Sequence, residues 1–209
     1  MSDCCDCDTL EARALAAKER RVLVTVLAIN IGTFLMMVGA SMLSGSSSLL
    51  SGTLDNFGDA LTYALSLAVV GSSAAAKARV ALAKGVLIGG AAAAVALRIA
   101  WGLASPEVPI VETMGGAAIL NLAANAACLW LLTPYRHGDV NMSSAWECSR
   151  NDIYEGCAVI LATATVWLTD SHWPDLVVAA ILLALFARSA SRVIRNAWRQ
   201  MSGSRLASA

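Results

Sequence analysis

Residues 22–43 read VLVTVLAINIGTFLMMVGASML, a stretch without a charged side chain. Such a run, wound as a helix with its flanks, reaches the roughly 20 residues that cross about 30 Å of hydrocarbon. Further apolar stretches cover residues 47–70, 80–103, 111–132, 153–168 and 176–187. The pattern predicts an all-α membrane protein with six transmembrane helices in a lipid bilayer.

The composition agrees with a membrane protein and argues against a soluble globule. Of 209 residues, 57% are hydrophobic and 14% are charged, and the mean hydropathy is +0.64. Soluble domains carry about 25% charged residues. The net charge is zero, so nothing in it indicates a nucleic-acid partner.

The basic residues predict the orientation of the chain, because Lys and Arg are retained on the cytoplasmic side. They occur before the first stretch, between the second and third, between the fourth and fifth, and after the sixth. The other connections, residues 44–46, 104–109 and 170–174, contain neither. We therefore expect both termini in the cytoplasm and a multi-pass protein of the cell inner (plasma) membrane. The first stretch is too long for a signal peptide and should be retained.

Three regions follow from this reading. Residues 1–20 form a cytoplasmic tail with Cys4, Cys5 and Cys7 and a short helix, residues 21–200 form the six-helix domain, and residues 201–209 form a short tail. The arginines after residue 187 recur at helical spacing and predict that the sixth helix continues past the membrane interface. The tail cysteines either deliver metal to the protein or belong to a disordered acidic segment, since their spacing matches no defined zinc motif.

Acidic groups inside a membrane are costly and mark ion or proton paths. Asp55 and Asp59 lie four residues apart and so share one face of the second predicted helix. Cys148 and Asp152 have the same spacing on the fifth. Counted at about 1.5 Å per residue from opposite ends, the two pairs reach similar depth. We expect them to meet.

Three carboxylates and a thiolate form a four-ligand set suited to Zn²⁺ or Cd²⁺. Such groups cannot all ionise together in a low dielectric, so metal binding should release protons. The alternative is that Asp55 and Asp59 only hydrogen-bond to polar neighbours such as Asn56 or Asn125. Cys148 could equally be a small buried apolar residue. Glu155 flanks the expected site and could relay protons or pair with Arg150.

Residues 48–67, SLLSGTLDNFGDALTYALSL, and 141–158, NMSSAWECSRNDIYEGCA, resemble the second and fifth helices of cation diffusion facilitator transporters. The resemblance implies a homodimer that exchanges cytoplasmic metal for external protons by alternating access. It implies metal ligands at Asp55, Asp59, Cys148 and Asp152.

Two departures from the family accompany the likeness. The family usually carries a cytoplasmic ferredoxin-like domain after the sixth helix, so we expect a six-helix form without it. Cys148 stands where histidine or aspartate is usual, and its softer thiolate should favour Cd²⁺.

Other functions fit less well. The sequence has no phosphate loop, H-E-x-x-H or Ser/His/Asp set, which argues against an enzyme, and it indicates no cofactor beyond the transported ion. A membrane metal-binding or sensing protein without transport remains the alternative.

Overall fold

The computed structural model describes residues 3–68, 74–137 and 140–206 of the chain, with side chains chiefly in 17–61, 86–137 and 145–188. In these residues the chain is helical throughout apart from short connections. The α-helices are α1 (Asp3–Ser44), α2 (Ser47–Ala68), α3 (Ala74–Ala104), α4 (Val111–Leu132), α5 (Val140–Thr169) and α6 (Trp173–Leu206), with a 3-10 turn, η1 (Thr133–Tyr135), between α4 and α5.

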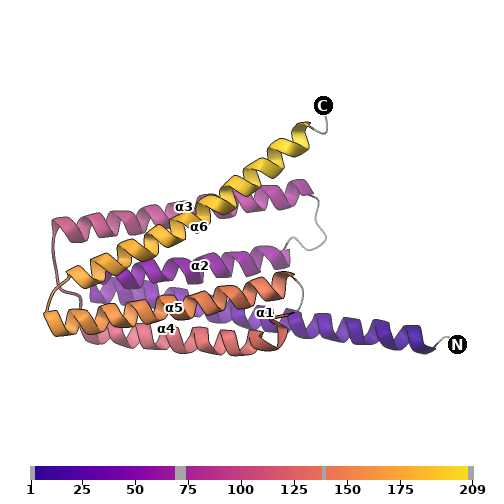
Figure 1. Ribbon diagram of the computed structural model, residues 1–209, viewed down its shortest axis with the longest axis horizontal. Helices are drawn as coiled ribbons and strands as arrows, with labels where there is room; N and C mark the ends of the chain where they lie inside the picture. The colour runs from indigo at the N-terminus through magenta and orange to yellow at the C-terminus, as the bar shows by residue number, and fades with distance from the viewer. Residues whose placement is uncertain (1–2, 69–73, 138–139, 207–209) are drawn as a thin grey trace.

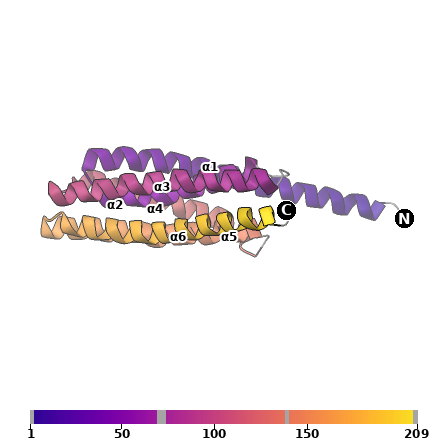
Figure 2. The ribbon, with the colours of Figure 1, turned by 90° about the horizontal axis from the view of Figure 1, so that it is seen from above.

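The helices run up and down along one long axis (Figure 1). Helices α1, α2, α4 and α5 pack together, and α3 pairs mainly with α6 on their flank. The start of α1 and the end of α6 lie at the same end of the bundle in both views (Figure 2). We call this the terminal end. The opposite end, with the α1–α2, α3–α4 and α5–α6 connections, is the turn end.

Three apolar clusters hold the bundle together. The largest joins α1, α2, α4, α5 and α6 towards the turn end, through residues such as Met37, Leu49 and Val159. A second joins α1, α4 and α5 around Val26 and Leu132, nearer the terminal end. A third fixes α3 and α6 to α2.

The outside of the bundle is apolar, as a lipid-facing surface requires. Leu35, Leu97 and Leu168 are between 63% and 74% exposed. Exposed tryptophans mark the helix ends, where their amphipathic rings suit the membrane interface: Trp101, Trp167 and Trp173 at the turn end and Trp130 towards the terminal end. Among the described residues, three helical segments are long and apolar enough to cross a membrane: 17–44, 86–104 and 111–135.

The predicted stretches fall within successive helices, and α4 has the same limits as its stretch. The stretch 47–70 is described only as far as Ala68. Helix α6 reaches Leu206, so the prediction that it continues past residue 187 is confirmed. Helix α1 begins at Asp3 and incorporates the expected short N-terminal helix. The side chains of Cys4, Cys5 and Cys7 lie outside the described ones.

A buried carboxylate fastens the turn end. Asp175, in the first turn of α6, is 2% exposed. It accepts hydrogen bonds from the Ser46 hydroxyl at 2.6 Å and from the backbone N–H groups of Ser47 and Ser48 at 2.7 and 3.0 Å. These N–H groups belong to the start of α2, where no intrahelical acceptor exists. We call Asp175 with these three serines the Asp175 lock.

The α1–α2 turn before the lock depends on Gly45. Its φ of 73° lies in the left-handed region, which favours glycine. Its carbonyl oxygen accepts a hydrogen bond from the Arg98 guanidinium of α3. The turn end therefore links α1, α2, α3 and α6 through polar contacts.

Candidate metal-binding site

Helices α2 and α5 carry their acidic residues towards one another. Asp55 and Asp59 are both half-buried on α2, one turn apart. On α5, Asp152 is 6% exposed, while Cys148 and Glu155 are half-buried. Helical spacing places Cys148, Asp152 and Glu155 on one side of α5, since residues three and four apart are neighbours on a helix surface.

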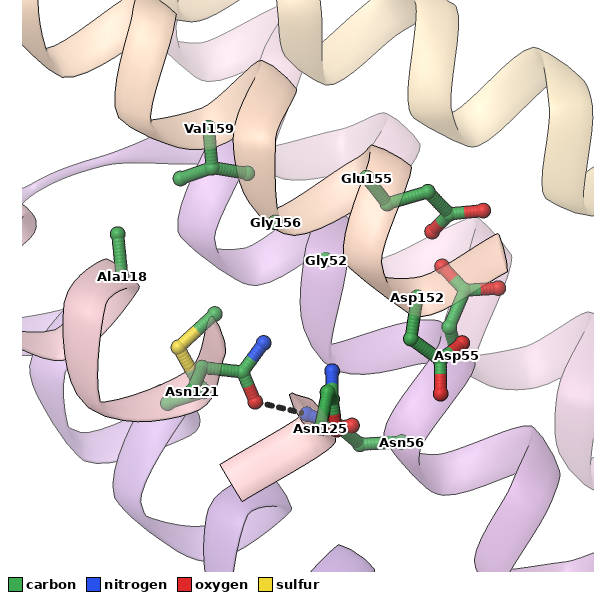
Figure 3. A pocket seen from close by; sticks show the side chains of 11 residues that line it. Gly52, Asp55, Asn56, Ala118, Asn121, Asn125, Asp152, Glu155, Gly156 and Val159 are labelled. Carbon is green, nitrogen blue, oxygen red and sulfur yellow. Dashed lines mark hydrogen bonds between the residues drawn. The ribbon is translucent and has the colours of Figure 1, made fainter. Parts of the chain in front are cut away.

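A small cavity lies between α2, α4 and α5 (Figure 3). Its volume is about 10 Å³, enough for about one water molecule or one bare ion. Met37, Ala118 and Val159 of the largest apolar cluster line part of its wall. The polar lining comes from three helices: Asp55 and Asn56 of α2, Asn121 and Asn125 of α4, and Asp152 and Glu155 of α5.

The carboxyl groups of the cavity interact closely. The Asp55 carboxyl group lies close to that of Glu155, and Asp152 lies within electrostatic range of Asp55. Asp59 lies within electrostatic range of both Asp55 and Asp152. Four acidic side chains from two helices therefore lie in one buried region.

The four predicted ligands are brought together only in part. Asp55 and Asp152 line the cavity, whereas Asp59 and Cys148 do not. In the described part of the chain, no three His, Cys, Asp or Glu side chains converge closely enough to hold a metal ion. The complete ligand set Asp55, Asp59, Cys148 and Asp152 therefore stays a prediction.

Helix α4 supplies residues that the sequence reading did not assign to the site. Asn121 and Asn125 lie on its buried face and are 6% and 2% exposed. The Asn56 amide of α2 donates a hydrogen bond of 2.8 Å to the Asn121 side-chain oxygen. The available signal was the occurrence of two asparagines one turn apart in an otherwise apolar span, because polar groups inside a membrane are costly.

Close packing brings α4 to the cavity. Gly156 of α5 faces Leu122 of α4, and a Cβ atom at Gly156 would lie only 3.1 Å from the Leu122 Cδ1 atom. A Cβ atom there would require the Leu122 side chain to shift by a few tenths of an ångström. Gly156 thus permits the approach that places Asn121 and Asn125 beside Asp152 and Glu155.

Comparison with known proteins agrees with this architecture. A search of curated proteins gives no match. A family model described as the cation efflux transmembrane domain matches residues 23–202, from the start of the first apolar stretch to near the end of α6. The match includes all the acidic residues of the cavity. The chain therefore belongs to the cation efflux family, the cation diffusion facilitators, and is a membrane protein that transports metal cations.

Proposed function

We propose that the protein exports Zn²⁺ or Cd²⁺ from the cytoplasm in exchange for protons, by alternating access to a site between α2 and α5. The observation that carries the proposal is the meeting of Asp55 and Asp152 at one buried cavity. Divalent ions are bound by such carboxylates. Asp59 and Cys148, one helical turn from Asp55 and Asp152 respectively, are the proposed remaining ligands.

The contact between Asp55 and Glu155 supports the proton coupling. Two carboxyl groups so close together in a low-dielectric region do not readily ionise at the same time, so without metal one of them should hold a proton. A divalent ion arriving at the same oxygens would compete with that proton. Exchange of metal for protons is then a consequence of shared ligands.

The distribution of charge supports export rather than import. Most Lys and Arg residues lie on the segments at the terminal end, and the connections 44–46, 104–109 and 170–174 at the turn end contain none. Arg98, near the turn end, donates a hydrogen bond to the Gly45 carbonyl oxygen. By the retention of basic residues in the cytoplasm, the terminal end faces the cytoplasm. The Asp175 lock and the largest apolar cluster lie on the other side of the cavity, and so we propose that the described conformation is closed towards the outside.

Uptake of Zn²⁺ into inverted membrane vesicles tests the function. With an acidic vesicle interior, we expect uptake by the parent protein, and a loss of at least about 100-fold for Asp55→Asn and for Asp152→Asn, because each removes a charge from the site. Collapse of the pH gradient should abolish accumulation. Uptake indifferent to the gradient and to both substitutions would overturn the mechanism, and binding without uptake would instead identify a metal-binding or sensing protein.

Asp170→Asn is the matched control. Asp170 is exposed at the end of α5 and has a φ of 47°, a conformation that asparagine also adopts readily. The substitution therefore removes one acidic side chain without disturbing the cavity or the backbone. We expect uptake within about twofold of the parent, as for most exposed substitutions.

A further inference from the structure

Two buried oxygen atoms at the cavity have no hydrogen-bond partner. They are Oδ1 of Asn125, on α4, and Oε2 of Glu155, on α5. Both residues line the cavity (Figure 3), and Asn125 is 2% exposed. Buried polar atoms are nearly always hydrogen-bonded, because an unpaired one forfeits its interactions with water. Each of the two oxygens thus lacks a partner, which could be a hydrogen-bond donor or a cation in the cavity.

The chemistry of the lining indicates a cation as this occupant. The carboxylates of Asp55 and Asp152 contribute further oxygens to the same cavity. The nearby Asn56 amide donates a hydrogen bond to Asn121 rather than to either of the two unpaired oxygens. An anion would be repelled by the carboxylates. One water molecule could donate a hydrogen to each of the two unpaired oxygens, but a cation would in addition be attracted by the carboxylates of Asp55 and Asp152.

The position of Asn125 follows from the contact one turn away. Asn121 is fixed to Asn56, which is adjacent to Asp55 in α2. Residues four apart lie on the same helix face, so this bond sets the register of α4 and leaves Asn125 one turn further towards the terminal end, where it still lines the cavity with Asp55 and Asp152. The register leaves Oδ1 of Asn125 unpaired at the cavity.

We infer that Asn125 is a ligand of the transported divalent ion through its side-chain oxygen, with Oε2 of Glu155 as a second oxygen ligand. The inference rests on the proposed function and deepens it. The site then takes ligands from α2, α4 and α5. It has more oxygen ligands than the predicted set of three carboxylates and one thiolate. Zn²⁺ accepts carboxylate oxygens as ligands and can expand from four to five ligands, so this set stays compatible with Zn²⁺.

The test compares metal binding by the purified full chain and the variants Asn125→Ala, Asn125→Asp and Asn30→Ala. Zn²⁺ affinity is measured by calorimetry, and Co²⁺ absorption reports the ligands directly. Asn125→Ala should weaken Zn²⁺ binding by about tenfold or more, the range seen when groups around a metal site are removed. It should also change the Co²⁺ spectrum. Asn125→Asp keeps the oxygen and should restore affinity to within about threefold of the parent.

Asn30→Ala is the matched control. Asn30 of α1 is 1% exposed and also has an unpaired Oδ1, but it does not line the cavity. We expect unchanged Zn²⁺ affinity for it. Metal-free melting temperatures show that each variant folds, and the Zn²⁺-dependent rise in melting temperature, which follows from binding to the folded state, should shrink only for Asn125→Ala.

The variant Asp55→Asn distinguishes a failure of the Asn125 assignment from a failure of the proposed function. If Asp55→Asn abolishes binding while Asn125→Ala binds Zn²⁺ like the parent with an unchanged Co²⁺ spectrum, Asn125 is no ligand and the proposed function stands. If Asp55→Asn also binds Zn²⁺ like the parent, both the Asn125 assignment and the proposed function are wrong. A loss of binding by Asn30→Ala equal to that by Asn125→Ala would also overturn the assignment.

Discussion

At the scale of single residues, Cys148 decides the softness of the proposed site. It is half-buried and one turn before Asp152. Thiolates bind soft ions more strongly than oxygen or imidazole ligands do. We expect Cys148→His to lower the preference for Cd²⁺ over Zn²⁺ by about tenfold, or ~1.4 kcal/mol in relative binding free energy. Competitive calorimetry with both ions measures the ratio.

Cys157→Ser controls for the loss of a thiol elsewhere on α5, since Cys157 is free and exposed. Its Cd²⁺/Zn²⁺ ratio should equal that of the parent. An unchanged ratio in Cys148→His would show that the thiolate does not ligate the transported ion.

Individual residues also show how far the sequence predicts the site. Asp55 and Asp152 were predictable because charged groups in apolar stretches are rare and costly. Asn125 was foreseen only as a possible hydrogen-bond partner of the aspartates. Its place at the cavity depends on the Asn56–Asn121 bond and on the approach of α4 at Gly156. Such contacts between helices have no signature in the spacing along one helix.

At the scale of helices, Asp175 stabilises the start of α2 from another helix. Its charge lies at the positive end of the α2 dipole, and it satisfies N–H groups that α2 cannot satisfy itself. Asp175→Asn removes the charge and one acceptor. We expect the free energy of unfolding to fall by about 2–3 kcal/mol, measured by thermal or denaturant unfolding in detergent.

Glu112→Gln is the control for Asp175→Asn. Glu112 is in the first turn of α4 at the same end of the bundle, and it is exposed. Its interaction with the helix dipole should contribute no more than about 1 kcal/mol. Equal losses of stability in the two variants would mean that the buried hydrogen bonds of Asp175 add nothing beyond a general dipole effect.

The helices themselves were largely predictable, and their ends less so. Helix α4 lies between Pro109 and Pro134, and its apolar stretch coincides with the helix. The start of α1 at Asp3 was not predicted to that residue, because the polar residues before Leu10 show no apolar periodicity. The sequence reading left Asp175 without a role, since the partners that define it lie far away in the chain.

At the scale of the whole molecule, α3 presents a face of small residues that nothing in the described chain covers. Gly89, Gly90, Ala93 and Ala94 are exposed, and a Cβ at either glycine would meet no atom within 4 Å. Small residues let membrane helices approach closely, and we propose that the protein forms a homodimer through this face. Gly90→Leu should shift purified protein from dimer to monomer, with the mass measured by light scattering or native mass spectrometry.

Gly116→Leu provides the comparison, because Gly116 of α4 is likewise exposed, and a Cβ atom there would meet no atom within 4 Å. That variant should remain dimeric. Dimers of unchanged strength in Gly90→Leu would place the interface on another helix.

The Asp175 lock also determines where α6 can tilt. It ties α6 to α2 at the turn end, while α6 diverges from α5 towards the terminal end (Figure 1). A tilt of α6 would therefore pivot about the Asp175 lock, and we call this point the fulcrum. From Asp175 to Leu206 the helix extends about 45 Å at 1.5 Å per residue, so a tilt of about 10° displaces its far end by roughly 8 Å.

A tilt of this kind would also displace residues near the proposed metal site. The Phe186 ring lies about 16 Å from the fulcrum along α6 by the same rise, and its Cε2 atom is 3.4 Å from where a Cβ on Gly58 would lie. Gly58 directly precedes Asp59. A tilt of about 10° shifts Phe186 by roughly 3 Å, enough to move against α2 beside a proposed ligand while the turn end stays closed. A tilt of α6 about the Asp175 lock would therefore move Phe186 against α2 near the proposed site and would move the end of α6 farther.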